Sequence, residues 1–468
     1  MTIDLSRYLT DSGPKYLAIA RALSEAIRQG ELPPSTRLPT HRELAEAMGI
    51  SVQTVSRAYA QAEKMGLVQA RTGSGTWVNA LDDSRDSAYL RKPEPRHEDA
   101  LIDLSIAHPV CPPGHHLRFR ETLAQLAEQA SPDIITANRP IAGLPHHRER
   151  ASQWLTQRLG VPGEPDERIL CNGAAHGLLL AVATIVQHGD LVLTEALTDH
   201  GLIALSRTLG FQLRGVAIDE QGVLPEALDM ACRRFKPRAV CLTPTQLNPT
   251  GATMPQERRD AVAEVLERHA VWLIEDDVLA LLEPPGLTPL TARVPHLGFH
   301  VTSLTKATMP GLRAGYLSVP RGQLHHTLPR MRATTWMATP LIFEIADAWL
   351  ADGTVDEMAA EQRHLLAERQ RLASRLLSGH ERTARATGMH VWLGLPTAWR
   401  TEELQQQAEQ EGVAITTAVP FMVEQTAAPR RVRVSVGAEP DIERFEEGLQ
   451  RLVNLLGEAP PPMMQFVY

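Results

Sequence analysis

Residues Ser303–Leu317 read SLTKATMPGLRAGYL, and this stretch decides the fold of most of the chain. Lys306 follows the apolar run His300–Ser303 and precedes a Pro-Gly pair, so it lies where a sheet strand ends. A lysine held beside apolar surface can lose its proton and attack an aldehyde to form a Schiff base. Ser303 and Arg313 can offer a hydroxyl and a guanidinium to a phosphate. An isolated lysine in such a context also fits a solvated loop, so the neighbouring strands must decide.

Upstream strands end in polar groups that suit a phosphorylated pyridine ring. Asp276 closes the apolar run WLIED, and ligands of open α/β sheets bind at such strand ends, where a carboxylate can pair with a protonated ring nitrogen. Asn248 lies in NPTG after the strand Ala239–Leu242, and its amide can donate to a phenolate oxygen. Backbone N–H groups between the strand that ends at Leu170 and the next helix can hold a phosphate; they belong to Gly173, Ala174 and Ala175.

From Leu101 onward, short apolar runs alternate with helical patterns such as Glu257–His269. This alternation predicts βαβ units on a mostly parallel sheet. The predicted strands are Arg168–Leu170, Leu191–Leu193, Ala239–Leu242, Val271–Ile274 and His300–Ser303.

The first 80 residues predict three helices followed by a hairpin. Apolar residues recur at helical spacing in Tyr16–Gln29. Thr40, with Glu43 three residues later, is typical of a capping box that opens a helix ending at Met48. Ser51 caps a third helix, Val52–Met65, and a Gly-containing turn between the last two helices is the helix-turn-helix spacing. A small protein-interaction domain is an alternative that the spacing alone leaves open.

Composition separates this unit from the rest. Residues 1–80 hold nine Lys and Arg and seven Asp and Glu, a net charge of +2, whereas the whole chain carries −8. The segment 81–100 is rich in charge, Ser and Pro and is interpreted as a linker. We therefore expect domains at 1–80 and 101–468. Bulk charge excludes a protein that coats nucleic acid, so DNA contact requires a local patch.

The stretch LPTHRELAEAMGISVQTVSRAYAQAEKMGLVQARTGSGTWV closely resembles the winged helix of the GntR family, including its β-hairpin wing at Leu67–Val78. The resemblance implies that the unit binds operator DNA. It also implies the residues that face bases or phosphates, the last two of them in the minor groove: Arg42, Ser51, Gln53, Thr54, Ser56, Arg57, Thr72 and Gly73.

The second part of the chain resembles the fold-type I aminotransferases over about 350 residues. The resemblance lies in the order of Gly173–Ala175, the NPTG motif, Asp276, the SxxK motif and Arg313. The resemblance implies an α/β domain that binds pyridoxal 5′-phosphate (PLP) as a Schiff base with Lys306. Arg433, in RVRVSVG, matches the arginine that clamps a substrate α-carboxylate; its alternative is a surface arginine at a strand edge. A GntR-type winged helix joined to such a domain is the layout of the MocR subfamily of transcriptional regulators. That subfamily uses PLP and an amino compound as effectors and forms homodimers, which we expect to be head-to-tail.

Three positions depart from the aminotransferase pattern. Asp199 stands where a ring usually stacks on the cofactor, and His200 is the neighbouring ring. Leu279 and Asn138 replace the tyrosines that usually bond the phenolate oxygen and the partner's phosphate. Each lost interaction is worth roughly 1 kcal/mol, so we expect PLP binding to be weakened but not abolished. Efficient transamination is not expected, and no residue is assigned a catalytic role.

Three interpretations follow: a PLP-responsive regulator, which we favour; a regulator whose large domain has lost PLP; and a DNA-tethered active aminotransferase. Four cysteines without CxxC or metal-ligand spacing indicate neither disulfides nor a metal site, and 18 histidines give no separate sign of one. The apolar stretch Leu178–Val186 is far short of the ~20 residues that span a bilayer, so we expect a cytoplasmic protein without membrane partners.

Overall fold

The computed structural model describes residues 15–28, 31–32, 36–64, 67–71, 75–78, 101–129, 132–136, 140–424 and 428–458. The chain divides into two compact units, Met1–Lys92 and Pro93–Tyr468. The predicted linker 81–100 lies outside the described residues. None of the helices within these ranges combines the length and the apolar character needed to cross a membrane.

The N-terminal unit is a winged helix-turn-helix. Its elements are α1 (Lys15–Arg28), α2 (His41–Met48), α3 (Val52–Lys64), β1 (Val68–Arg71) and β2 (Gly75–Val78). The capping box is present, because Thr40 Oγ1 accepts from the Glu43 N–H at 3.3 Å and the Thr40 N–H donates to Glu43 Oε2 at 2.7 Å. Gly49, at φ 61°, ends α2 in the left-handed conformation that glycine tolerates. Ser51 Oγ then accepts from the Thr54 N–H at 3.1 Å, so the predicted cap of α3 is confirmed.

One small core holds this unit together. Leu23 of α1 and Val55 and Ala58 of α3 are fully buried, and the hairpin adds Val68 and Val78, which pair directly across the two antiparallel strands. Burying this apolar stripe leaves the opposite face of α3 in solvent.

A seven-stranded sheet forms the centre of the second unit. Its order is β4 (Arg168–Asn172), β12 (Ala314–Ser318), β11 (Gly298–Ser303), β10 (Trp272–Asp276), β9 (Ala239–Leu242), β5 (Leu191–Glu195) and β6 (Gln212–Val216). β12 runs antiparallel to β11 and β4, whereas the other neighbouring strands are parallel. The five predicted strands are all present, and β6 and β12 join them.

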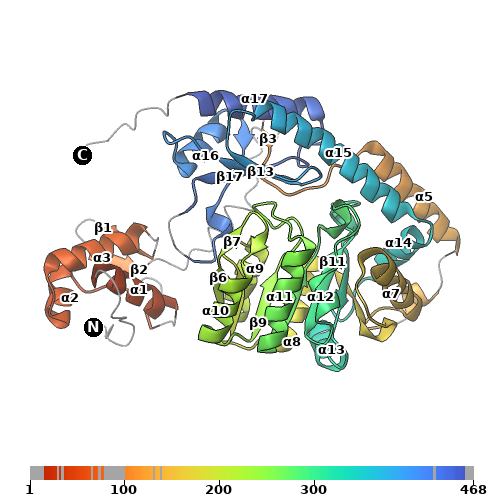
Figure 1. Cartoon of the computed structure of the whole chain (residues 1–468), viewed down its shortest axis with the longest axis horizontal. Coiled ribbons are helices and arrows are strands. Elements are labelled where there is room, and N and C mark those ends of the chain that lie inside the picture. Colours follow the sequence, from red (N-terminus) through yellow and green to blue (C-terminus); the bar gives the residue numbers. More distant parts are fainter. Residues whose placement is uncertain are drawn as a thin grey trace. The chain divides into compact units, whose positions relative to one another are not determined.

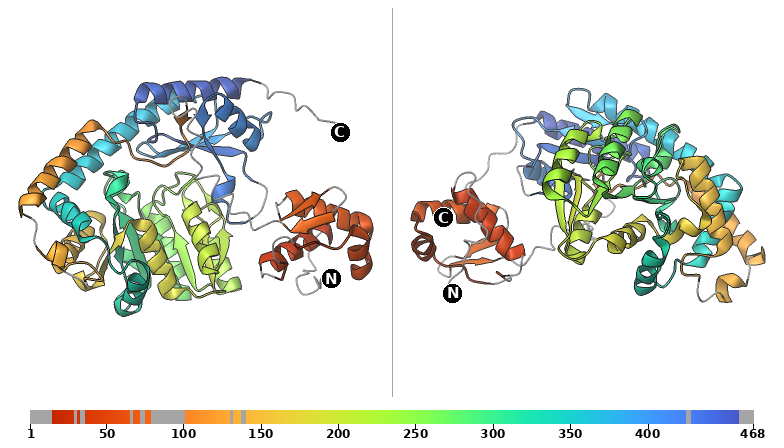
Figure 2. Two further views of the ribbon diagram at one scale, coloured as in Figure 1. Left: turned by 180° about the vertical axis from the view of Figure 1, so that it is seen from behind. Right: turned by 60° about the horizontal axis from the view of Figure 1, so that its bottom comes forward.

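Helices cover both faces of this sheet. In Figure 1, α10 (Pro225–Phe235), α11 (Gln256–His269) and α12 (Leu290–Arg293) lie in front of the strands, and α8 (Ala174–Ile185) lies behind them. The view from behind in Figure 2 brings α8 forward. Buried side chains accordingly divide into two clusters, with Leu273 of β10 in one and its neighbour Ile274 in the other. Parallel strands buried on both faces have the near-continuous apolar sequence that is seen here.

The remaining elements flank the sheet or build a second, smaller one. The four-stranded sheet has the order β13 (Arg382–Ala384), β14 (His390–Gly394), β17 (Arg431–Ser435) and β16 (Thr416–Thr417). Two-stranded pairs are formed by β15 (Val413–Ala414) with β3 (Ile102–Asp103), and by β7 (Ile218–Asp219) with β8 (Gly222–Val223). The other helices are α5 (Pro113–Gln129), α6 (Asp133–Thr136), α7 (Pro145–Leu159), α9 (His200–Leu209), α13 (Leu324–Thr334), α14 (Pro340–Ala351), α15 (Thr354–Leu376), α16 (Thr401–Gln410) and α17 (Ile442–Gly457), with the short 3-10 turns η3 (Pro165–Glu167), η4 (Ala280–Leu282), η5 (Pro310–Leu312) and η6 (Val419–Phe421).

Candidate functional site

Register brings the predicted site residues to one edge of the large sheet. Asp276 ends β10 and Ser303 ends β11, and these strands are parallel, so their carboxyl ends meet. β12 returns antiparallel and pairs Ala314 with Asn172 of β4, which places Arg313 beside Gly173. This edge is the ligand-binding edge of an open α/β sheet.

Gly173 and Arg313 form a cradle at the N-terminus of α8. Gly173 is the N-cap residue of α8, at φ 82°, and a Cβ built on it would lie 2.6 Å from Arg313 Nη2. A Cβ on Gly315 would lie 2.5 Å from the Gly173 carbonyl carbon, so close approach of the backbone requires Gly315, whereas the positive φ favours glycine at position 173. The first N–H groups of α8, including those of Ala174 and Ala175, have no intrahelical acceptor and point toward this end. Free N–H groups with a guanidinium beside them suit a phosphate.

Lys306 lies among charged groups at the same edge. Its Nζ donates to the Ala107 carbonyl oxygen at 2.6 Å. Burial lowers the pKa of Lys306 below its usual value, as do Arg433 and Arg313, while Asp199 and Asp276 act in the opposite direction. A lowered pKa makes the neutral, nucleophilic amine more accessible.

Asp276 has a buried oxygen that lacks a hydrogen-bond partner among the described residues, namely Oδ1. Burial, followed by the charges of Asp199 and Asp277, raises the pKa of Asp276 to about 7. A buried carboxylate oxygen without a partner is costly, and a cationic N–H donor would relieve that cost. This orphaned oxygen therefore fits the protonated ring nitrogen of PLP.

Asn248 connects Asp199 to Arg433. Its Nδ2 donates to Asp199 Oδ2 at 2.7 Å, and its Oδ1 accepts from Arg433 Nη1 at 2.7 Å. Asp199 also caps α9 by accepting from the Gly201 N–H at 2.8 Å. Burial raises the pKa of Asp199, but His200 and the hydrogen bonds from Gly201 and Asn248 outweigh burial and hold that pKa below its usual value. Asp199 is therefore a carboxylate that engages the amide expected to serve the cofactor.

Arg433 is fully buried on β17 rather than exposed at a strand edge. Its Nη2 donates to the Ser105 carbonyl oxygen, and its guanidinium carbon lies 4.8 Å from the ring centroid of Phe421. A carboxylate ligand would compete with the Ser105 carbonyl and with Asn248 Oδ1 for this guanidinium. The backbone between β3 and α5 thus contacts both Lys306 and Arg433, through Ala107 and Ser105.

His390 of β14 is a neighbour that sequence reasoning missed. It is buried, and its Nδ1 has no hydrogen-bond partner among the described residues. Burial, with the charges of Arg433 and Lys306, lowers the pKa of His390 well below its usual value. Neither its spacing in the sequence nor its neighbours in the strand point to the site, so no sequence signal indicates it.

The positions that depart from the aminotransferase pattern have different environments. Leu279 is buried in the main core. The His200 ring packs edge-on against Phe421 with their centroids 6.2 Å apart, and its Nδ1 lies 3.7 Å from Asp199 Oδ2. Ser303 is buried at the end of β11. Asn138 lies outside the described residues.

The predicted DNA-contacting residues of the first unit are mostly exposed. Solvent reaches Arg42 on α2 and Gln53, Ser56 and Arg57 on α3. The Ser51 and Thr54 hydroxyls lie 2.8 Å apart and hydrogen-bond each other, and the Arg57 guanidinium lies 5.9 Å from the ring centroid of Tyr16. Thr72 and Gly73 lie outside the described residues.

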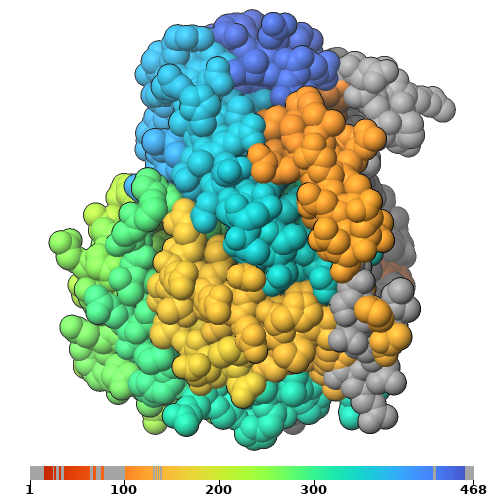
Figure 3. Space-filling model, turned by 90° about the vertical axis from the view of Figure 1, so that its right-hand side faces the viewer, coloured from red at the N-terminus to blue at the C-terminus, as the bar shows by residue number. Residues whose placement is uncertain are grey.

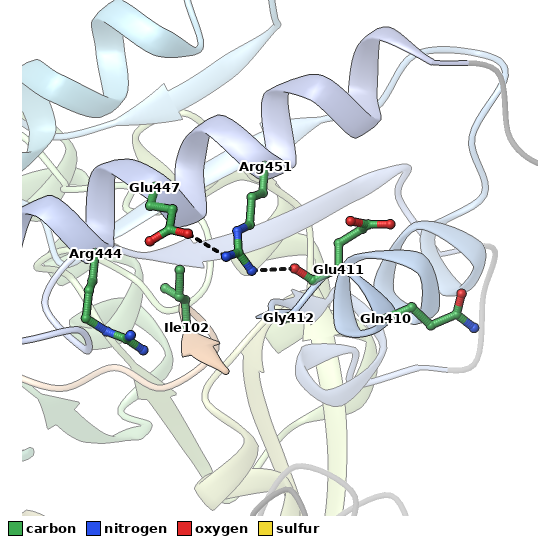
Figure 4. A pocket seen from close by; sticks show the side chains of 7 residues that line it. All are labelled: Ile102, Gln410, Glu411, Gly412, Arg444, Glu447 and Arg451. Atoms are coloured by element: carbon green, nitrogen blue, oxygen red, sulfur yellow. Dashed lines mark hydrogen bonds and ion pairs between the residues drawn. The ribbon is translucent and has the colours of Figure 1, made fainter. Parts of the chain in front are cut away.

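A hollow between α16, α17 and β3 contains two arginines but offers no comparable site (Figure 4). Arg451 is held by Glu447 and by the Glu411 carbonyl oxygen at 2.8 Å. Arg444 Nε lies 3.4 Å from Glu439 Oε2. Because both guanidinium groups already have partners within the chain, the hollow carries no argument for a ligand.

Comparison with known proteins identifies the family of each unit. The aminotransferase class I and II family model matches residues 101–452, and the model for bacterial regulatory proteins of the gntR family matches residues 15–78. The crystal structure of an archaeal alanine:glyoxylate aminotransferase superposes with a TM-score of 0.72 at 21% identity, over 85% of this chain and 99% of that one. The second unit is thus a fold-type I aminotransferase domain. The chain belongs to the aminotransferase class I and II family and, with its gntR domain, has the architecture of the MocR subfamily.

Curated relatives share both domains over most of their length. The uncharacterized HTH-type transcriptional regulator YdeF of Bacillus subtilis is 29% identical over 95% of each chain. The probable rhizopine catabolism regulatory protein MocR of Rhizobium meliloti is 26% identical, over 86% of this chain and 85% of its own. The vitamin B6 salvage pathway transcriptional repressor PtsJ of Salmonella typhimurium is 27% identical, over 81% of this chain and 86% of its own.

Proposed function

We propose that the chain is a transcriptional regulator that binds operator DNA through its first unit and, through its second, PLP and an amino-compound effector. The observation that carries the cofactor assignment is the placement of Lys306 and the unpartnered Asp276 Oδ1 at the same sheet edge as the Gly173 cradle. A buried amine, a carboxylate and an anion cradle are the three groups that such a cofactor requires.

Each of these residues has a distinct task in holding the cofactor. Lys306 is the covalent attachment point, Asp276 receives the ring N–H, and the N-terminus of α8 with Arg313 holds the phosphate. When bound, PLP supplies an aldehyde that condenses with a primary amine and releases water. Ser303 adds a buried hydroxyl at the end of β11.

The effector is an amino compound with a carboxylate, because Arg433 is a buried guanidinium at the site. Arg433 now contacts the Ser105 carbonyl and Asn248, so a carboxylate must take over one of these contacts. Releasing the Ser105 carbonyl frees the backbone between β3 and α5. This exchange gives the liganded and unliganded states different contacts, which any ligand-driven change requires.

Regulation, not turnover, is the use that the site supports. Leu279 offers no hydroxyl to the cofactor, and Asp199 offers no ring. The proton transfers of transamination need a tuned site, so we expect slow or no multiple turnover. We further propose a homodimer, head-to-tail, whose two first units bind paired half-sites.

The cofactor assignment is tested on the full-length protein by absorbance. After incubation with PLP, we expect a band at about 400–430 nm and, after borohydride reduction, a covalent adduct mapped to Lys306 by mass spectrometry. Lys306→Ala should lose both signals. Lys236→Ala, an exposed lysine of the same unit, should keep both. A colourless wild type without an adduct contradicts the assignment.

The effector assignment is tested by DNase footprinting with saturating PLP. An α-amino acid effector should change the protected region or its affinity, whereas the corresponding amine without a carboxylate should not. Arg433→Lys should weaken the response to the amino acid by about ten- to a hundredfold, because a bidentate contact with the carboxylate is lost. Identical footprints with and without every amino acid tested contradict the proposal.

One observation favours a second candidate, a regulator whose large domain works without PLP. Asp199 occupies the Asn248 amide that would otherwise serve the cofactor. In that case the absorbance experiment gives no band, while operator binding and dimerisation persist.

A further inference from the structure

Two adjacent histidines and a glutamate meet where α7 packs against α14. His146 and His147 lie in the first turn of α7, and Glu344 lies in the first half of α14. On the face shown in Figure 3, the golden surface of α7 meets the teal surface of α14. His146 and Glu344 are 198 residues apart in the sequence, so no local spacing predicts this group.

Both histidine rings lie close to one carboxylate oxygen of Glu344. His146 Nε2 lies 3.2 Å and His147 Nε2 lies 3.1 Å from Glu344 Oε1. All three potential ligand atoms lie within 4.8 Å of one another. The imidazole of His147 is only 2% exposed, that of His146 is 51% exposed, and the carboxylate of Glu344 is 14% exposed. The group is therefore anchored in the protein and open to solvent on one side.

His147 is close to Glu344 but does not hydrogen-bond to it. His146 Nε2 makes a hydrogen bond with Glu344 Oε1, whereas neither ring nitrogen of His147 has a hydrogen-bond partner among the described residues. Two buried, unpartnered nitrogen atoms are costly. The 3.1 Å gap between His147 Nε2 and Glu344 Oε1 is not bridged by a hydrogen bond, and a metal ion bound to both atoms would satisfy the nitrogen.

The two nitrogen-to-oxygen separations match the edges of a metal coordination shell. Zinc binds imidazole nitrogen and carboxylate oxygen at about 2.0–2.2 Å, so the ligand atoms of a tetrahedral site lie about 3.3 Å apart. Two nitrogen atoms and one oxygen are also the donor set of sites that keep an open position. We propose that His146, His147 and Glu344 form a site for Zn²⁺, with a water molecule as the fourth ligand on the exposed side.

The surroundings suit this ligand set. The nearby cation Arg150 is engaged by Asp347, with 3.4 Å between Nε and Oδ1. Gly143, at φ 113°, packs so closely on Leu170 of β4 that the chain entering α7 is held on the sheet. A bound ion would fasten α14 to this fixed helix end.

The test uses tag-free, full-length protein from which metals have been removed with a chelator. Titration with Zn²⁺ against a chromogenic chelator should show one tight site per chain. Glu344→Gln and His147→Leu should each weaken binding at that site at least about 100-fold, more than the loss typical of residues that only orient a ligand. Co²⁺ added to the wild type should give the visible absorption of a four-coordinate ion, and both variants should lose it.

A matched control is available on α13. His325 and His326 are also adjacent, with ring centroids 3.8 Å apart, so the double change to alanine removes a histidine pair of the same kind. This control should keep the tight site. Equal loss in the control, no tight site in the wild type, or unchanged binding in Glu344→Gln would each overturn the proposal. If His147→Leu does not fold, Glu344→Gln and His146→Ala decide the result, because both replace side chains that solvent reaches.

Discussion

The amide nitrogen of Asn248 donates a 2.7 Å hydrogen bond to Oδ2 of Asp199, although these residues are 49 positions apart. The same amide accepts from Arg433, so the proposed effector arginine is linked to the residue that stands in place of the stacking ring. A ligand that draws either partner away therefore affects the other.

Replacing Asp199 with Tyr should strengthen PLP binding. The change supplies a ring and releases the Asn248 amide for the cofactor. An aromatic contact is worth about 0.5–1.5 kcal/mol, which corresponds to about a two- to tenfold lower dissociation constant, measured by absorbance titration of the apoprotein. Asp199→Asn removes the charge without adding a ring and should gain less. Weaker binding in Asp199→Tyr than in the wild type would refute this account of the position.

Replacing Gly173 with Ala should weaken phosphate binding in the cradle. The added Cβ would lie 2.6 Å from the Arg313 guanidinium, and the residue has φ 82°. Gly189→Ala is the control for backbone strain, because Gly189 has φ 85° but a Cβ added there would meet no neighbouring atom within 4 Å. Equilibrium dialysis should show weak PLP binding in Gly173→Ala and normal binding in Gly189→Ala. Equal effects would mean that strain, not filling of the cradle, is responsible.

The contribution of Asp276 to the stability of the apoprotein should fall as pH rises from about 4 to about 7. Its pKa is raised to about 7 by burial, so over this range the folded chain holds a proton that the unfolded chain has released. Because the folded state binds more protons, raising the pH favours unfolding, and the penalty is complete above the folded pKa. Glu195, with a pKa also raised to about 7 by burial, acts with the same sign.

The contribution of Asp276 is isolated by comparing wild type with Asp276→Asn in urea titrations at several pH values. The variant lacks this carboxyl group, so the contribution of Asp276 to the pH dependence of the unfolding free energy should be missing from its profile. Added PLP should raise the stability of the wild type at neutral pH, since it supplies a partner for the carboxylate. It should raise the stability of the variant less. Superimposable pH profiles would show that Asp276 does not carry the shifted proton.

Replacing Arg42 with Ala should weaken operator binding without unfolding the first unit. The side chain is exposed on α2 and belongs to no core cluster. If it contacts a phosphate, the slope of log affinity against log salt should fall by about one. Arg21→Ala, an exposed arginine on α1, is the matched control and should leave both affinity and slope unchanged in mobility-shift titrations.

The regular parts of the fold followed from the sequence because their signals are local. Helix α2 carries its own capping box, and three of the predicted strands of the large sheet are uninterrupted apolar runs, namely Leu191–Leu193, Ala239–Leu242 and Val271–Ile274. Strand β12 escaped prediction because it begins with Ala314 and Gly315, residues of low β-propensity. Strand β6 alternates polar and apolar residues at the sheet edge, which gives a weak signal.

The candidate site could be predicted only as far as side chains and strand ends allow. Asp276 and Lys306 follow from where strands stop, whereas Arg313 precedes β12, a strand that was not predicted. The carbonyl oxygens of Ser105 and Ala107 could not be foreseen, because backbone acceptors leave no mark on residue identity. His390 and the group around His147 depend on long-range packing between elements, which no spacing in a single sequence records.

The reversal of β12 ties two functions to one short piece of chain. Lys306 and Arg313 both lie on the connection from β11 to β12, and hydrogen bonds between those strands clamp its two ends. An insertion or deletion within that connection would displace the amine and the guanidinium together. Variants of this loop should therefore lose the covalent attachment and the phosphate contact together. Relatives in which this connection has a different length would be expected not to bind the cofactor at all, instead of binding it through only one of the two contacts.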